Sequence, residues 1–345
     1  MEGVLIKAEA DTPRVLTRHL AEIESWLRAS NPLAAGSWLG RMGAYHMGWS
    51  SAEGNASASN GKRLRPGLCL WTAEACGGDP QAAMGAALAI EWIHNFTLIH
   101  DDIQDVSRER RHRPSVWSVW GSAQAINAGD GLFAVGFNSL LEGDGPPSRR
   151  LRAAQVITAA VMEVIQGQCL DLASEGLPQT PPQRYMKLIS AKTGALVGAA
   201  MEAGAVMAGA PAPVRKGVRR AGRFLGLAFQ VRDDWLGVWG DPELTGKSRD
   251  GDLAQRKLSH PVVAAYAVAD RSQRSVFRRL FLDRKPGGEA QIRQLLEDLG
   301  GPGLTVAAPG ELARAAVSAF RQAGMTEQAV EEFAQVARYA AERTG

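Results

Sequence analysis

Apolar residues recur at helical spacing through nearly every segment of this 345-residue chain. Runs that alternate apolar and polar residues and are rich in β-branched side chains are scarce. The pattern therefore predicts an all-α fold, arranged as a single large helical bundle. Clusters of Gly, Pro, Ser and Asn predict breaks between helices at Gly54 to Gly61, Gly143 to Pro147, Leu177 to Pro182, Ala210 to Pro213, Asp241 to Gly251 and Gly300 to Gly310.

The predicted breaks are all short. None has the length of an interdomain linker, and no repeat recurs at a fixed period. A chain of this size buries an adequate core without disulfides or a structural metal. We therefore predict one domain over residues 1–345, with looser parts at residues 1–12 and 300–345.

Charge and cysteine content narrow the class of protein. The net charge is only +3 and the basic residues are scattered, which argues against a nucleic-acid partner. Cys69, Cys76 and Cys169 stand in apolar settings without metal-ligand spacing, as expected for reduced thiols of a cytoplasmic protein. The first residues lack a signal-peptide pattern. The most membrane-like segment, Thr193 to Ala210, is interrupted by Glu202, so we predict a buried helix and no transmembrane segment.

A first acidic motif of the form DDxxD ends an apolar helical run. Asp101 and Asp105 are one turn apart, roughly 5 to 6 Å between Cβ atoms, and their repulsion costs a few tenths of a kcal/mol. Mg²⁺ offsets such repulsion, because it takes one or two carboxylates together with waters and phosphate oxygens. Asp102 completes the motif, and Arg110 and Arg111 follow as cations suited to phosphates. Alone, the pattern also fits a solvated acidic helix end with ordinary surface arginines.

A second acidic pair changes that balance. Asp233 and Asp234 follow another apolar helical run, and Gln230 lies one turn earlier on the same face. Burying carboxylates without a partner is costly, so two such clusters on apolar helices indicate bound cations.

Basic residues near these motifs match an anionic ligand. The stretch GKRLRP opens a helix with Lys62 and Arg65, and further basic or polar residues follow at Lys192, Thr193, Lys247 and Lys257. His94 lies two turns before Asp101 on about the same stripe, which favours ligand binding over a core histidine. The chain has no GxxxxGK[ST], GxGxxG, GxSxG or HExxH motif, so phosphate recognition falls to metal and side chains.

With these motifs in order, the sequence resembles the trans-isoprenyl diphosphate synthase family, which includes farnesyl and geranylgeranyl diphosphate synthases. The resemblance runs from GKRLRP to about Lys257 and includes LIHDDIQD, GQCLDL, AKTGAL and FQVRDDWLGVWGD. It implies a helical fold around a central tunnel, a homodimer, and Mg²⁺-dependent head-to-tail condensation of isopentenyl diphosphate with an allylic diphosphate.

The resemblance also implies residue roles. Asp101, Asp105 and Asp233 would coordinate several Mg²⁺ ions, and Asp102, Asp234 and Lys192 would complete the catalytic set. The allylic diphosphate would contact Arg110, Lys192, Thr193, Gln230, Lys247 and Lys257. Isopentenyl diphosphate would contact Lys62, Arg65, His94 and Arg111, and Gln168 and Asp171 would play supporting roles. Two departures from the family pattern stand out: Gly237 replaces a third Asp, and His112 with Arg113 replaces a small residue.

Product length is expected to depend on the helix before the first motif. Phe96 lies five residues before Asp101, roughly 7 Å along the helix axis, with Ile93 and Thr97 nearby. Phe96 points roughly 140° away from Asp101 and Thr97 only about 40°, so geometry alone leaves an ordinary core phenylalanine open. The resemblance implies that an aromatic residue here floors a short tunnel, giving a C20 product, with farnesyl diphosphate as second choice.

Two other functions fit parts of the pattern. A class I terpene cyclase also uses Asp-rich metal sites, but it has no need of the GKRLRP cluster and His94 for a second diphosphate. A noncatalytic partner subunit of a prenyl synthase is expected to have eroded motifs, whereas both acidic motifs are intact here.

Overall fold

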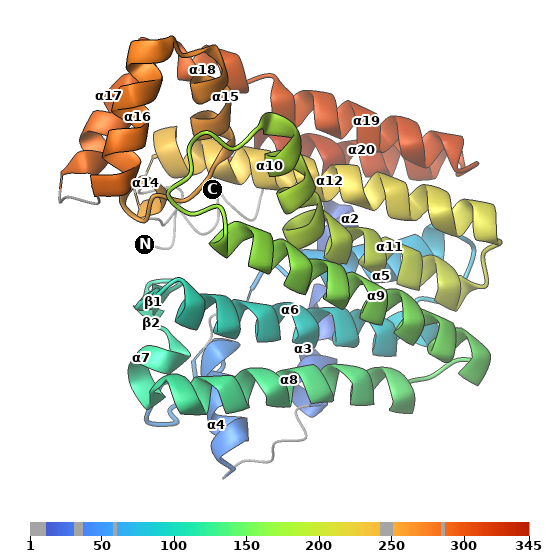
Figure 1. The fold of residues 1–345 in the computed structure, drawn as a ribbon. Coiled ribbons are helices and arrows are strands. Elements are labelled where there is room, and N and C mark those ends of the chain that lie inside the picture. Colours follow the sequence, from blue (N-terminus) through green and yellow to red (C-terminus); the bar gives the residue numbers. More distant parts are fainter. Residues whose placement is uncertain (1–11, 31–36, 58–60, 242–250, 284–286, 345) are drawn as a thin grey trace. The chain divides into compact units, whose positions relative to one another are not determined.

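The computed structural model describes residues 12–30, 37–57, 61–241, 251–283 and 287–344. Within these ranges the chain is helical except for turns, loops, one isolated bridge and a hairpin of two short strands (Figure 1). The all-α prediction is confirmed. The chain divides into two compact units, which we call the N-terminal unit (Arg14–Thr158 and Ala199–Lys216) and the C-terminal unit (Met1–Pro13, Ala159–Gly198 and Gly217–Gly345). This division does not test the prediction of a single domain, which stays a prediction.

The N-terminal unit contains the first acidic motif. Its elements are α2 (Arg14–Thr17), α3 (Leu20–Ala29), α4 (Trp38–His46), α5 (Leu64–Ala75), η1 (Gln81–Ala83), α6 (Met84–Gln104), β1 (Glu109–Arg110), β2 (Arg113–Pro114), α7 (Val116–Trp120) and α8 (Ser122–Glu142). Three helices contribute residues to both units: α9 (Pro147–Leu172), α11 (Ala195–Ala208) and α12 (Ala212–Trp239).

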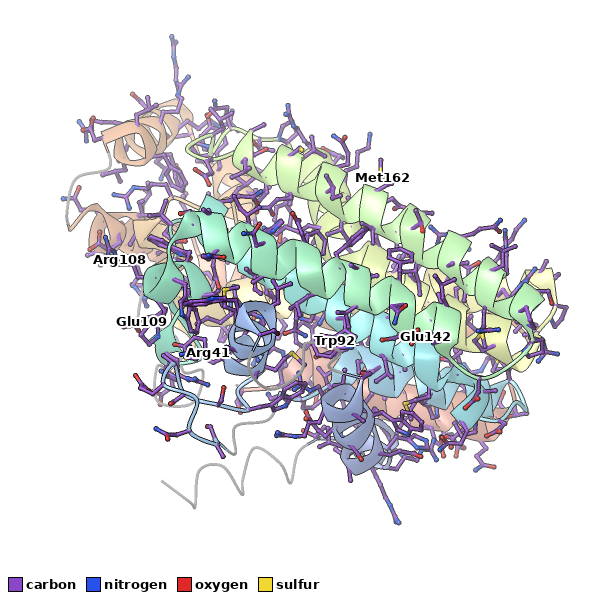
Figure 2. All side chains as sticks on the ribbon, turned by 90° about the horizontal axis from the view of Figure 1, so that it is seen from below. Arg41, Trp92, Arg108, Glu109, Glu142 and Met162 are labelled. Carbon is purple, nitrogen blue, oxygen red and sulfur yellow. The ribbon has the colours of Figure 1, made fainter. Side chains whose placement is uncertain are left out.

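Helix α6 is the core helix of the N-terminal unit. Residues 84–93 are buried all round, with Ile90 and Trp92 fully buried, whereas most residues from His94 onward are partly exposed (Figure 2). Glycines let it approach α8 closely: a Cβ at Gly85 would lie 2.7 Å from the carbonyl oxygen of Ser139. The first acidic motif therefore ends a helix whose first half lies in the core of the unit.

The C-terminal unit contains the second acidic motif. Its further elements are α10 (Pro182–Ile189), η2 (Ser190–Gly194), α14 (Gly251–Ala254), α15 (His260–Val268), α16 (Arg271–Asp283), α17 (Gly288–Asp298), α18 (Gly301–Thr305), α19 (Ala308–Gln322) and α20 (Glu327–Glu342). Tyr185, Val231 and Phe277 belong to one buried cluster that joins α10, α12 and α16. Phe320 and Phe333, both fully buried, stack at 4.5 Å between α19 and α20.

Among the described residues, most predicted breaks coincide with helix ends, while most of Asp241 to Gly251 lies outside the described residues. The segment Gly300 to Gly310 is the exception, because it forms α18 and the first residues of α19. Two glycines and a proline at a helix start are compatible with helix, since Gly300 precedes α18 with φ 71° and Pro302 occupies an early position that needs no N–H. The looser packing predicted for residues 300–345 stays a prediction.

Two helices have the length and composition of a membrane span, namely Gln81–Gln104 and Pro147–Leu172. The apolar window of the first is 72% buried within the protein and that of the second 44%, with Met162 exposed on α9 (Figure 2). A mostly buried core helix passes the same test, so this is weak evidence for a span. The segment Thr193 to Ala210 forms the end of η2 and α11 and is mostly buried, as predicted.

Candidate functional site

The first acidic motif separates its adjacent carboxylates by burial. Asp101 is partly exposed, whereas Asp102 is buried and accepts two hydrogen bonds of 2.8 Å from Nε and Nη2 of Arg110. This bidentate pairing holds the carboxylate rigidly. Asp105 is the C-cap of α6 and is partly exposed like Asp101. Arg110, predicted to contact a diphosphate, is therefore fastened to the motif itself.

The hairpin after the motif contains one departure from the family pattern, His112 with Arg113. β1 pairs with β2, and the two turn residues, Arg111 and His112, have φ values of 53° and 59°. Positive φ at both central residues is the geometry of a type I′ hairpin turn, and it is strained for most residues other than glycine. Arg113 anchors the hairpin by donating to the carbonyl oxygen of Ser50 at 2.6 Å and lying 4.2 Å from the ring centre of Tyr45. The strained turn therefore fixes where Arg111 stands.

Three predicted contacts for isopentenyl diphosphate lie on α5 and α6 or just before them. Lys62 is exposed, and Arg65 lies 3.0 Å from Nε2 of His94. Arginine has only donors, so this imidazole nitrogen is the acceptor and the neutral ring carries its proton on Nδ1. Burial and then the charge of Arg65 hold the pKa of His94 well below 6.5, in agreement with a neutral ring. His94 thus keeps an N–H donor while Arg65 keeps its charge.

A buried ionic network supports this cluster. Arg63 is 3% exposed, has φ 45°, and pairs with Glu24 at 2.5 Å and Glu91 at 2.8 Å. Burial alone would lower the pKa of Arg63, but Glu91 and Glu24 outweigh it and raise the pKa. Asn95 donates to Glu91 at 3.0 Å and lies 3.1 Å from Nε2 of His46. The network ties α3, α4 and α6 to the residue between Lys62 and the start of α5.

In the second acidic motif, as in the first, one of the two adjacent carboxylates is buried and the other is partly exposed. Asp234 is buried and accepts hydrogen bonds from Nε2 of Gln230 at 2.9 Å, from the backbone N–H of His260 at 2.8 Å, and from the hydroxyl of Tyr185. Burial and the neighbouring Asp234 raise the pKa of Tyr185 well above 10, so the phenol keeps the proton that it donates. Asp233 is 31% exposed by its side chain.

Lys192 and Thr193 lie on the π-helical turn η2. Such turns inside α-helices are rare and often mark functional positions. Nζ of Lys192 donates to Asp171 at 2.6 Å, and the hydroxyl of Thr193 donates to Gln230 at 2.7 Å. A Cβ at Gly167 would lie 2.4 Å from the backbone N of Lys192, so only glycine lets α9 approach here. The GQCLDL and AKTGAL motifs are therefore parts of one contact.

The remaining predicted contacts are placed less fully. Lys257 is partly exposed and follows Arg256, which is buried with φ 57° and donates to the carbonyl oxygen of Leu253 at 2.6 Å. Gln168 is buried on α9. Lys247 lies outside the described residues. Gly237 is buried in α12, and nothing in the structure tests the consequence of its departure from the family pattern.

The structure brings the predicted residues together within each unit. In the N-terminal unit it links Arg65 with His94 and Arg110 with Asp102; in the C-terminal unit it joins Lys192 to Asp171, and Thr193 through Gln230 to Asp234.

The carboxylates of the two acidic motifs fit a magnesium ion, although they form no cluster of three or more metal-binding side chains among the described residues. No group of three or more His, Cys, Asp or Glu side chains suited to a metal occurs among the described residues. Mg²⁺ needs only one or two carboxylates, because waters and phosphates complete its octahedron. Asp101 and Asp105, partly exposed and one turn apart, supply such a pair, and Asp233 supplies a single carboxylate.

The predicted chain-length residues face different neighbours. The ring of Phe96 makes edge contacts with His100 at 4.9 Å and with Phe133 of α8 at 5.2 Å. Ile93 is buried against α8, while the hydroxyl of Thr97 donates to the carbonyl oxygen of His94. Phe96 therefore belongs to an aromatic row between α6 and α8 and is only partly buried.

Sequence reasoning missed three supporting residues. Glu91 pairs with Arg63, Tyr185 donates to Asp234, and Arg343 pairs with Asp233 at 2.7 Å. Glu91 had a readable signal, since a carboxylate inside an apolar helical run requires a partner. The other two contacts join residues that are far apart in the sequence, with separations of 49 positions for Tyr185 and Asp234 and of 110 for Arg343 and Asp233. Local sequence patterns do not show such contacts.

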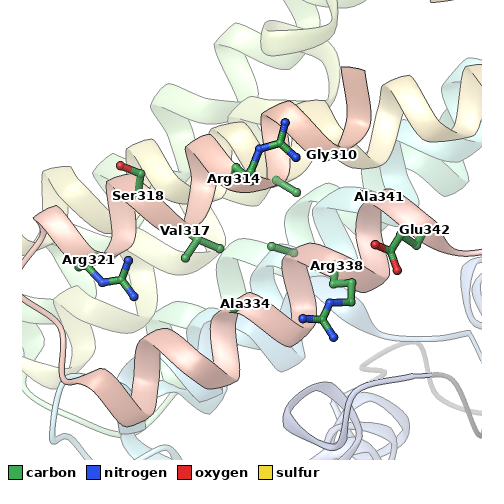
Figure 3. A pocket seen from close by; sticks show the side chains of 11 residues that line it. Gly310, Arg314, Val317, Ser318, Arg321, Ala334, Arg338, Ala341 and Glu342 are labelled. Carbon is green, nitrogen blue, oxygen red and sulfur yellow. The ribbon is translucent and has the colours of Figure 1, made fainter. Parts of the chain in front are cut away.

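A groove of about 400 Å³ lies between α19 and α20 (Figure 3). Alanines and Val317 form much of its wall, and Arg314 and Arg338 stand along it. It includes none of the predicted site residues.

Comparisons with known proteins agree with this geometry. A family model described as polyprenyl synthetase matches residues 50–299. The (2E,6E)-farnesyl diphosphate synthase of Mycobacterium tuberculosis is 44% identical over 220 residues, 64% of this chain and 61% of that protein, so the match spans about three fifths of that relative. The geranylgeranyl diphosphate synthase of the same organism is 39% identical over 265 residues, 76% of this chain and 72% of that protein.

A solved structure extends the likeness to nearly the whole chain. The polyprenyl synthetase from Streptomyces coelicolor A3(2) has 35% sequence identity and a TM-score of 0.87, covering 95% of this chain and 99% of that one. Three findings agree: the family model matches more than two thirds of the sequence, the fold is shared with a solved member, and the motifs occur in the family's order. The chain therefore belongs to the polyprenyl synthetase family.

Proposed function

We propose that this protein is a Mg²⁺-dependent prenyltransferase that condenses isopentenyl diphosphate head to tail with an allylic diphosphate, giving a short-chain all-trans prenyl diphosphate. The observation that best supports this proposal is common to both Asp pairs: one Asp is buried and its neighbour is partly exposed. Asp102 and Asp234 are buried and held by protein donors, while Asp101 and Asp233 are partly exposed, Asp233 with Arg343 as a partner. One carboxylate of each pair is thus enclosed by the protein, and the partly exposed one is the proposed ligand of a metal cation.

The chain's own residues then have separable tasks. Lys192, Thr193 and Lys257 would bind the allylic diphosphate, and Lys62, Arg65, His94 and Arg111 would hold isopentenyl diphosphate. Bound Mg²⁺ would neutralise the charge that develops on the departing diphosphate. No side chain in this set is suited as general base, so we assign the final proton to the departing diphosphate. The apolar helices would keep water away from the reacting carbons.

The names of the relatives favour this reaction over a class I terpene cyclase. The Arg65–His94 pair favours it as well, because it adds a cationic site beyond the two Asp motifs. Purified protein with Mg²⁺, isopentenyl diphosphate and each of the C5, C10 and C15 allylic diphosphates should form longer prenyl diphosphates. Release of diphosphate with cyclic hydrocarbon and no use of isopentenyl diphosphate would indicate a cyclase, and inactivity with every substrate would indicate a noncatalytic subunit. A homodimer is also proposed, measurable by light scattering.

The isopentenyl diphosphate contacts predict a kinetic split. Lys62→Ala, Arg65→Ala and His94→Ala should each raise KM for isopentenyl diphosphate about tenfold or more, since a hydrogen bond to a charged group contributes roughly 1.5 to 3 kcal/mol. KM for the allylic substrate should stay near its normal value. Arg108→Ala, an exposed arginine of the same unit, is the matched control. Equal rises in both KM values would show that this cluster is misassigned.

We further propose geranylgeranyl diphosphate as the main product, with farnesyl diphosphate second. Phe96→Ala should then shift the products toward longer chains, because it opens space in the aromatic row beside Phe133. The stability loss should stay below the roughly 3 to 5 kcal/mol of a fully buried Phe→Ala change, since Phe96 is only partly buried. Product analysis by chromatography measures the shift. Phe137→Ala, one contact farther along the row, is the control. An unchanged product in Phe96→Ala would move the floor to Ile93, Thr97 or Phe133.

A further inference from the structure

The end of α20 is fastened to the second acidic motif inside the C-terminal unit. Arg343, the first residue after α20, donates from Nη2 to Oδ1 of Asp233 at 2.7 Å. Its carbonyl oxygen accepts from Nε of Arg232 at 2.9 Å, and its guanidinium lies 4.0 Å from the ring centre of Phe229. The side chain of Arg343 is only 7% exposed. Three contacts to little more than one turn of α12 thus fix this arginine, unlike a loose surface ion pair.

The same carboxylate is the one assigned above to Mg²⁺. A guanidinium hydrogen-bonded at 2.7 Å is a strong, charge-assisted partner. A divalent cation repels that guanidinium, and Arg232 adds a second positive charge beside it; burial and then Arg343 lower the pKa of Arg232. The metal and Arg343 therefore compete for Asp233.

We infer that Arg343 is a positioning residue that serves as the counter-ion of Asp233 in the metal-free protein and is displaced when metal and diphosphate bind. The inference rests on the proposed function, since it requires a metal at Asp233. The counter-ion role of Arg343 makes the apparent metal affinity depend on the carboxy-terminal helix α20. The matched family model ends at residue 299, so Arg343 lies in a part of the chain beyond that match.

The test measures metal binding to the full chain without turnover. Mn²⁺ replaces Mg²⁺ in the presence of inorganic diphosphate, and free Mn²⁺ is counted by electron paramagnetic resonance. Arg343→Ala should lower the apparent Kd for Mn²⁺ about fivefold or more, the range of an ordinary coupling between two sites. Arg343→Lys keeps the positive charge, so its apparent Kd for Mn²⁺ should stay near that of the wild type. Arg338→Ala, an exposed arginine of α20 that lines the groove instead, should leave the Kd unchanged (Figure 3).

Hydrogen exchange provides a second readout that a purely structural contact would not move. In the wild type, Mn²⁺ with inorganic diphosphate should speed exchange in a peptide covering residues 335–344, because the displaced side chain no longer holds the end of α20. Asp233→Asn should speed exchange in that peptide without metal. Circular dichroism confirms that each variant is folded.

The possible failures are distinguishable. Equal Mn²⁺ affinity in the wild type and Arg343→Ala, or weaker binding in Arg343→Ala, would overturn the counter-ion role while leaving the proposed function intact. Absence of Mn²⁺ binding in every form of the protein would overturn the proposed function and the counter-ion role with it.

Discussion

Asp101→Ala and Asp233→Ala are each expected to lower kcat at least about a thousandfold while the helical fold survives. Each change removes a proposed metal ligand, and stabilisation of a few kcal/mol by a metal corresponds to roughly three orders of magnitude in rate. Asp101 is partly exposed and its removal relieves repulsion by Asp105, so the thermal midpoint of that variant should stay within about 2 °C. Steady-state kinetics at saturating Mg²⁺ and thermal melts measure both effects.

Two further variants make this prediction specific. Asp102→Ala should lower both activity and stability, because it strands Arg110, which donates twice to the buried carboxylate. Glu109→Ala removes an exposed carboxylate from the neighbouring hairpin and should leave both quantities near normal. Near-normal turnover of Asp101→Ala and Asp233→Ala at ordinary Mg²⁺ would contradict the metal assignment.

Arg63→Ala is expected to lower the free energy of unfolding by about 3 to 5 kcal/mol. The variant leaves Glu24 and Glu91 buried without their shared cation, and breaking a buried ion pair from one side has this cost. The total stability of a protein of this kind is about 5 to 15 kcal/mol, so the loss is a large fraction of it. Thermal melts and urea denaturation followed by circular dichroism should show it.

The neighbouring lysine is the matched control for that prediction. Lys62→Ala also removes one positive charge, but from an exposed side chain, and should change stability by no more than about 0.5 kcal/mol. It should still weaken isopentenyl diphosphate binding, as expected above. The two adjacent positions would then separate support of the fold from contact with substrate. A loss below about 1 kcal/mol in Arg63→Ala would show that solvent or nearby groups readily compensate the two glutamates.

The helical architecture was predictable because it depends on short-range periodicity. Apolar residues three and four apart predict a buried helix such as α6, and Gly-Pro clusters predict the ends of α8 and α11. The same local rule failed for Gly300 to Gly310, where the composition of a break forms α18. A Gly-Pro-Gly start is tolerated there because the early N–H groups of a helix need no helical partner.

The acidic motifs were predictable as motifs, but the different tasks of their members were not. Nothing in the letters DD shows that Asp102 is buried under Arg110 or that Asp234 accepts from Tyr185 and His260. Those distinctions follow from contacts between distant parts of the chain. The roles of the individual residues and the position of Lys247 stay predictions.

The π-helical turn of Ser190–Gly194 has a consequence for how this protein can change by insertion and deletion. A π turn contains one residue more than the α-helix around it, and one residue corresponds to about 100° of helix rotation. Loss of a single codon within this turn would restore a plain α turn and leave the helices on either side in nearly the same register, but it would remove or shift the side chains that the turn itself presents. Lys192 and Thr193 lie within the turn, so their contacts with Asp171 and Gln230 would be lost. A frame-preserving deletion of three nucleotides is thus expected to inactivate the protein without removing any residue of the acidic motifs.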